Sequence, residues 1–137
     1  MKNNLVGGLD DRQIKYLGGT HEGKKHDKKI CDEEGTRFPD GADLYRDTGF
    51  QGHDLDNIAI HQPKKKPRNA KLSDADKEGN RLISSIRVVI EHIIAGVKRC
   101  RIVKDVFRNT KEDYEDVVME LACGLHNYRS YCRNQGY

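Results

Sequence analysis

The strongest constraint on the fold is a long helical pattern in the second half of the chain. Ser73 and Asp76 have the spacing of a helix-capping box, with Asp in place of the usual Glu, and they predict a helix over about residues 74–99. Apolar residues recur along it at helical spacing and form one broad stripe, which comprises Leu82, Ile83, Ile86, Val89, Ile90, Ile93, Ile94 and Val97. So broad a stripe needs packing partners, and we expect a sheet on one side of the helix.

A second amphipathic segment follows nearer the C-terminus. Asn109 or Thr110 can cap a helix over about residues 111–131. Its apolar stripe, the face that such a helix normally buries, comprises Tyr114, Val117, Val118, Leu121, Leu125 and Tyr128. Between the two helices, residues 102–107 are compatible with a short strand or an irregular link.

The first 60 residues carry short strand-like segments separated by turns. Strands are predicted at residues 14–17, 43–47 and 58–60, and the polar residues 24–34 are compatible with a helix. Strands followed by helices indicate a mixed α/β domain. We therefore divide the chain into a strand-rich part (1–60), a basic loop (61–72) and a part with two long helices (73–137).

Composition limits how much these elements can bury. Hydrophobic residues make up 35% of the chain and charged residues 34%, so the core should be thin and the chain is expected to be a piece of something larger. We see no signal peptide and no apolar run near the roughly 18 residues that span a bilayer. The four cysteines lack metal-site spacing, and Cys123 should be a buried free thiol. A soluble protein of the reducing cytoplasm fits these features.

Positive charge is clustered although the net charge of +3 is mild. Residues 61–71 contain no acid and five basic residues, namely Lys64, Lys65, Lys66, Arg68 and Lys71. Residues 98–108 contain five more basic residues against one acid, Asp105. Such runs are candidate phosphate contacts. The alternative for the first run is a solvated, flexible loop.

Two carboxylates lie where chemistry could occur. Asp47 ends a predicted strand next to a glycine turn, and it either supplies a functional group there or only caps the turn. Glu91 lies in the most apolar part of the long helix, on one face with Arg87 and Lys98. A buried or half-buried Glu91 would need a partner or a metal ion. The alternative is an exposed ion pair between Arg87 and Glu91.

The spacing of these residues resembles a known signature. Arg87, Glu91 and Lys98 match the R-E-K part of the Y-R-E-K signature of IS4- and IS5-type transposases, with Ser84 in place of Tyr. The runs HDKKICDE, LYRDTGFQG, QPKKKPR, NRLISSIRVVIEHIIAGVKRCRIVKDVFRN and MELACGLHNYR also resemble the DDE superfamily endonuclease domain of IS5-type transposases. The resemblance covers nearly the whole chain.

The resemblance implies an α/β fold of the RNase H-like type, with a mixed five-stranded sheet and flanking helices. It implies that Asp47 and Glu91 are catalytic carboxylates that bind Mg²⁺ or Mn²⁺, in keeping with two-metal phosphodiester chemistry. It further implies a bacterial cytoplasmic protein that acts on DNA at insertion-sequence ends and targets. The expected contacts with DNA phosphates are Arg87, Lys98, Lys64, Lys65, Lys66 and Arg68.

One departure from the family pattern is expected to matter. The first catalytic Asp and the first strand of the family have no counterpart in the chain, so the sheet should be incomplete. Three functions therefore stay open. The chain is a metal-dependent transposase; or an inactive truncated remnant or split-frame subunit that only binds DNA or its partner half; or a basic helical interaction module. The expected protein partners are an upstream transposase half or further copies of the chain.

Overall fold

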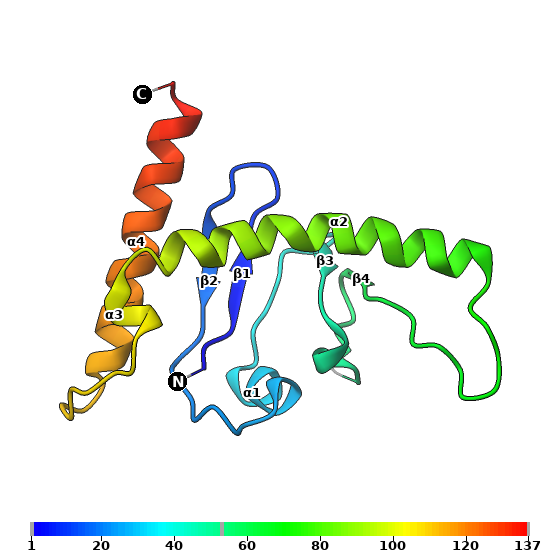
Figure 1. Ribbon diagram of the computed structural model, residues 1–137, viewed down its shortest axis with the longest axis horizontal. Helices are drawn as coiled ribbons and strands as arrows, with labels where there is room; N and C mark the ends of the chain where they lie inside the picture. Colours follow the sequence, from blue (N-terminus) through cyan, green and yellow to red (C-terminus); the bar gives the residue numbers. More distant parts are fainter. Residues whose placement is uncertain (1, 53, 137) are drawn as a thin grey trace. The chain divides into compact units, whose positions relative to one another are not determined.

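The computed structural model describes residues 2–52 and 54–136. In chain order the elements are β1 (Leu5–Gly7), β2 (Ile14–Leu17), α1 (Asp27–Glu34), β3 (Asp43–Tyr45), the 3-10 turn η1 (Thr48–Phe50), β4 (Ala59–His61), α2 (Asp74–Val97), α3 (Arg101–Lys104) and α4 (Tyr114–Asn134) (Figure 1). The chain is therefore mixed α/β, with strands first and long helices later, as predicted. Within the described ranges no helix is long and apolar enough to cross a membrane.

The strands form two small sheets. β1 and β2 pair antiparallel, with Leu5 opposite Leu17, whereas β3 and β4 pair parallel, with Leu44 opposite Ile60. Over the described residues these are two separate two-stranded sheets. The local sequence pattern did not reveal β1, because a strand of three residues offers too short an alternation to recognise.

Most element boundaries lie within three residues of the prediction. α2 begins at Asp74 as expected, and the Asp76 N–H donates to Ser73 Oγ over 3.1 Å, so the predicted cap is confirmed. α2 ends at Val97, two residues early. The segment predicted as a strand or irregular link instead begins with a four-residue helix, α3.

The chain divides into two compact units. The hairpin unit comprises Met1–Lys24 and Val89–Tyr137, and the parallel-strand unit comprises Lys25–Val88. In the parallel-strand unit, Ile30 of α1 is fully buried. α2 is continuous and supplies its first part to the parallel-strand unit and its last part to the hairpin unit.

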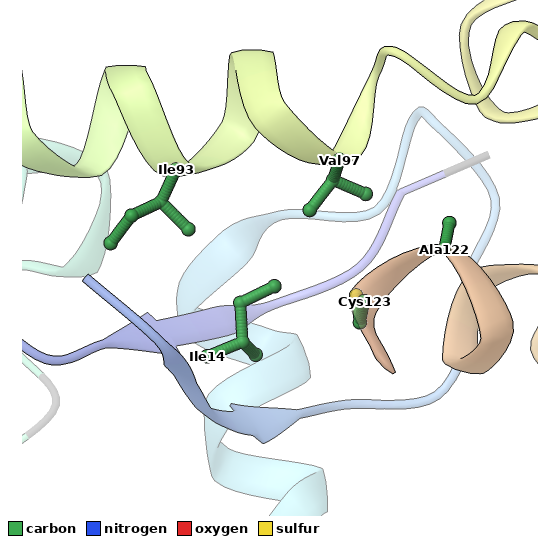
Figure 2. Packing of buried hydrophobic residues seen from close by; sticks show 5 residues of the cluster. All are labelled: Ile14, Ile93, Val97, Ala122 and Cys123. Carbon is green, nitrogen blue, oxygen red and sulfur yellow. The ribbon is translucent and has the colours of Figure 1, made fainter. Parts of the chain in front are cut away.

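The core of the hairpin unit is small, as the composition predicted. Ile14 of β2, Ile93 and Val97 of α2, and Ala122 and Cys123 of α4 point toward one another (Figure 2). Cys123 is a buried free thiol, as predicted, and this burial raises its pKa to about 11.

Helix α4 is also fastened to the hairpin by hydrogen bonds. The Asn127 amide accepts the Ile14 N–H over 2.7 Å and donates to the Ile14 carbonyl over 2.9 Å. His126 Nε2 donates to the Arg12 carbonyl over 2.9 Å. These side chains satisfy backbone groups of β2 and of the turn before it, which would otherwise need another strand or water.

The predicted buried face of α4 is therefore largely wrong. Val118 is buried as expected, but the remaining stripe residues are exposed, namely Tyr114, Val117, Leu121, Leu125 and Tyr128. The face that packs inward comprises Val118, Ala122, Cys123, His126 and Ser130. Its small and polar side chains allow close approach to the hairpin and bond to its backbone, whereas hydropathy counts only large apolar residues.

A close approach between α2 and α4 generates a stability prediction. A Cβ atom at Gly96 would collide with the His126 ring, and that ring is fixed by its bond to Arg12. Gly96→Ala should therefore lower the free energy of unfolding by about 1–3 kcal/mol, as overpacked sites do. Urea titrations followed by helical circular dichroism would measure the change.

Gly79 provides the matched control in the same helix, because nothing lies within 4 Å of a Cβ built there. Gly79→Ala should stabilise the protein by roughly 0.5–1 kcal/mol through helix propensity alone. Equal effects of the two substitutions would contradict the packing described for Gly96.

Candidate metal and nucleic-acid site

Asp47 lies just beyond the end of β3. The Arg46 N–H still bonds to the His61 carbonyl over 3.0 Å, so strand pairing extends to the residue before Asp47. Asp47 itself is extended and caps η1, with Oδ1 accepting the Thr48 N–H over 2.6 Å. The sequence left open whether this residue caps the turn or serves a function. It does cap the turn, and that bond fixes one of its two carboxylate oxygens.

The second oxygen of Asp47 faces a cation. Arg87 Nη2 of α2 lies 3.2 Å from Asp47 Oδ2, and the two side chains are 53% and 45% exposed. A half-exposed ion pair of this kind contributes at most about 1 kcal/mol. Both residues were singled out from the sequence, but their pairing was not predicted. Nothing in the sequence pairs residues that lie forty positions apart.

Glu91 follows Arg87 by four residues in the unbroken helix α2 and belongs to the hairpin unit. It is exposed, so of the two alternatives that the sequence left open the structure favours the exposed side chain over a buried or half-buried carboxylate. The buried side of this part of α2 is carried by Ile93 and Val97, and Glu91 lies outside their arc of the helix. Lys98, just beyond α2, is exposed as well. Glu91 and Lys98 are therefore accessible to solvent and to a polyanion.

The basic loop is anchored at one end. Lys64 exchanges two backbone hydrogen bonds with the Asn80 side chain of α2, at 2.9 Å and 3.1 Å. Lys64 Nζ donates to Asp76 over 2.7 Å, and bonds from Lys64 and Ser73 lower the pKa of Asp76. Sequence reasoning did not identify Asp76 and Asn80 as the anchors, although the capping-box pattern had placed Asp76 at the helix start.

The remaining cations of the loop are open to solvent. Lys65, Lys66 and Arg68 are exposed, and no ion pair is found for them in the described residues. Phosphate contacts require charges that are accessible in this way. Lys64 instead holds the start of the loop against α2.

Comparison with known proteins identifies the family. The model of the DDE superfamily endonuclease family matches residues 3–127, which is most of the chain. The chain belongs to the DDE superfamily endonuclease family.

One curated relative of this DDE endonuclease chain is the "Probable transposase for insertion sequence element IS702" from Microchaete diplosiphon. It is 30% identical over 128 residues, which cover 93% of the present chain and 46% of the relative. The chain thus spans less than half the length of the relative. No solved structure matches the chain significantly.

Divalent metal use is general in this family, so the acidic residues must be tested as ligands. No group of three or more His, Cys, Asp or Glu side chains suited to a metal ion occurs among the residues the structure describes. Asp47 nevertheless fits the chemistry of Mg²⁺, because it is accessible and has one oxygen held only by an exposed ion pair. Glu91 also offers an accessible carboxylate.

The basic loop generates a prediction about DNA affinity. Changing Lys65, Lys66 and Arg68 together to Ala should weaken binding to duplex DNA, because it removes the charges that can bind up to three phosphates. A plot of the logarithm of the DNA-binding constant against the logarithm of the salt concentration should become less steep. Its slope should fall in magnitude by about 0.9 for each phosphate that the loop no longer neutralises. Fluorescence anisotropy over a salt series would measure this slope.

The control removes the same charge elsewhere, by changing the exposed residues Lys24, Lys29 and Arg37 to Ala. If both triple variants reduce the slope equally, the effect is one of net charge and the loop has no special role.

Proposed function

We propose that the chain is part of a DNA transposase and that Asp47 and Glu91 are two of its metal-binding carboxylates. The proposed activity is metal-dependent DNA cleavage and strand transfer in the transposition of an insertion sequence of the IS5 type. Membership of the DDE endonuclease family supports the cleavage chemistry, and the name of the relative supports the role in transposition. The proposed catalytic domain has an RNase H-like fold, to which the present mixed strands and helices would contribute.

One observation carries the proposal. Asp47, at the end of β3, is paired with Arg87, which precedes Glu91 by four residues in α2. The acid at the strand end is thus paired with an arginine that can itself bind phosphate, and the second acid follows that arginine by about one helical turn. Arginine is well suited to this role because its guanidinium can give two parallel hydrogen bonds to a phosphate group.

Asp47 and Glu91 would hold the divalent ion, Mg²⁺ or Mn²⁺, through carboxylate oxygens. When bound, such an ion stabilises the charge on the attacking and leaving oxygens of the phosphodiester. The Thr48 N–H holds Asp47 Oδ1 in place, so Oδ2 is the oxygen that can change partner. The turn η1 therefore orients the carboxylate before DNA arrives.

Arg87 would neutralise the Asp47 carboxylate until the metal ion and DNA bind. Its ion pair is half-exposed and weak, so little free energy opposes its transfer to a DNA phosphate. Lys98, exposed beyond the end of α2, would provide a second phosphate contact. Both cations would position the backbone of the DNA without reading its sequence.

The accessible basic loop favours a second candidate function, which is DNA binding without cleavage. Lys65, Lys66 and Arg68 could bind phosphates whether or not Asp47 and Glu91 hold a metal ion. On this alternative the chain acts as an inactive remnant or as a split-frame subunit for an upstream transposase half.

A nicking assay separates the two functions. The 137-residue chain is incubated with supercoiled plasmid and Mg²⁺ or Mn²⁺, beside Asp47→Asn and Glu91→Gln. The transposase proposal expects any nicking by the chain to fall at least about a hundredfold in each variant, as when a group acting in the transition state is removed.

Two results would count against the proposal. Nicking that both variants retain would remove Asp47 and Glu91 from the site. Binding of the plasmid without nicking by the unmodified chain would favour the alternative. Glu78→Gln, an exposed carboxylate of the same helix, serves as the control and should behave like the unmodified chain.

A further inference from the structure

The outward face of α4 is unusually apolar for a surface. Tyr114, Val117, Leu121, Leu125 and Tyr128 are between 38% and 67% exposed. At 100° per residue they fall within an arc of about 80°, so they form one continuous stripe along most of the helix. We call these five residues the outer stripe. Contiguous exposed apolar surface of this kind marks interaction sites in soluble proteins.

The outer stripe is symmetric about its central residue. Its members are separated by three, four, four and three positions, and their types read Tyr, Val, Leu, Leu, Tyr. If two copies of α4 pair antiparallel about a two-fold axis at Leu121, Tyr114 meets Tyr128 of the other copy and Val117 meets Leu125. A surface that is complementary to itself in this way is the requirement for a two-fold symmetric interface.

Gly124 supports a helix as the partner. It lies beside the outer stripe, it is exposed, and nothing in the described part of the chain lies within 4 Å of a Cβ built there. Glycine inside a helix costs roughly 0.5–1 kcal/mol relative to alanine. Gly96 has a reason to lack a side chain, namely the His126 ring, whereas Gly124 has none within the described residues. The missing side chain at Gly124 would allow the backbone of a second helix to approach α4 closely at this point.

The charges of α4 select the antiparallel orientation. Residues 112–120 contain five acids and no base, whereas residues 121–134 contain no acid and two arginines, of which Arg129 also donates to the Gly96 carbonyl of its own chain over 3.0 Å. Antiparallel pairing brings the acidic half of one helix beside the basic half of the other, and it also opposes the two helix dipoles favourably. Parallel pairing would place like charges together.

We infer that the outer stripe is a homodimer interface, in which α4 pairs antiparallel with α4 of a second copy about Leu121. Covering about 100 Å² on each stripe side chain of both copies removes roughly 1,000 Å² from water, near the lower bound for a specific interface. An interface of this small size is typical of weak association, so the dimer should be reversible. The inference is independent of metal binding and of catalysis.

Sedimentation equilibrium of the full chain over a concentration series tests the interface. A monomer–dimer equilibrium is expected, and Leu121→Lys should weaken it at least tenfold because two lysines would meet at the axis. Leu82→Lys is the matched control, since Leu82 of α2 is 61% exposed and Leu121 is 64% exposed. Circular dichroism would confirm that both variants stay folded.

Cross-linking tests the orientation. After mild oxidation of a mixture of Tyr114→Cys and Tyr128→Cys chains, peptide mapping should find disulfides that join position 114 of one copy to position 128 of the other. Links only between identical positions would overturn the antiparallel arrangement. A chain that is monomeric at all concentrations, or a dimer that Leu121→Lys leaves intact, would overturn the interface itself.

Discussion

The continuity of helix α2 is the constraint on which the rest of the structure depends. It runs unbroken from Asp74 to Val97, starts on the Ser73 cap, and contributes to both compact units. Near its middle Arg87 binds Asp47, and near its end Ile93 and Val97 fill the core of the hairpin unit. The Arg87 that binds Asp47 and the Glu91 four residues later therefore belong to the same helix.

Hydrogen bonds from side chains of α4, in addition to a small apolar core, hold this helix on the β1–β2 hairpin. The Asn127 amide bonds to both backbone groups of Ile14, and His126 bonds to the Arg12 carbonyl. A charge-rich chain can hold a helix on a two-stranded hairpin in this way, because each bond satisfies a backbone group that would otherwise cost free energy on burial. The same arrangement turns the large apolar residues of α4 outward, where they can meet a second chain.

The sequence predicted correctly those features that depend on residues close together in the chain. The cap at Ser73, the two long helices and the strand before Asp47 all follow from spacing and residue type. The pairing of Asp47 with Arg87 could not be predicted, because it depends on tertiary packing between distant segments. The inward face of α4 was missed for a related reason, since its side chains are selected for backbone hydrogen bonds and small size, which hydropathy does not measure. The exposure of Glu91 could not be decided from the sequence, because a run of apolar neighbours in sequence occupies only one side of a helix.

The central claim is that Asp47 and Glu91 hold the same divalent ion, and Mn²⁺ binding to the intact chain tests it most directly. Titration followed by the electron paramagnetic resonance of free Mn²⁺ should show saturable binding, at least about tenfold weaker in Asp47→Asn and in Glu91→Gln. The double variant should lose far less than the two single effects added together, because the residues act as one site. Asp56→Asn, an exposed acid elsewhere, should bind as the unmodified chain does. Unchanged Mn²⁺ affinity in either single variant, or fully additive losses in the double variant, would contradict the claim.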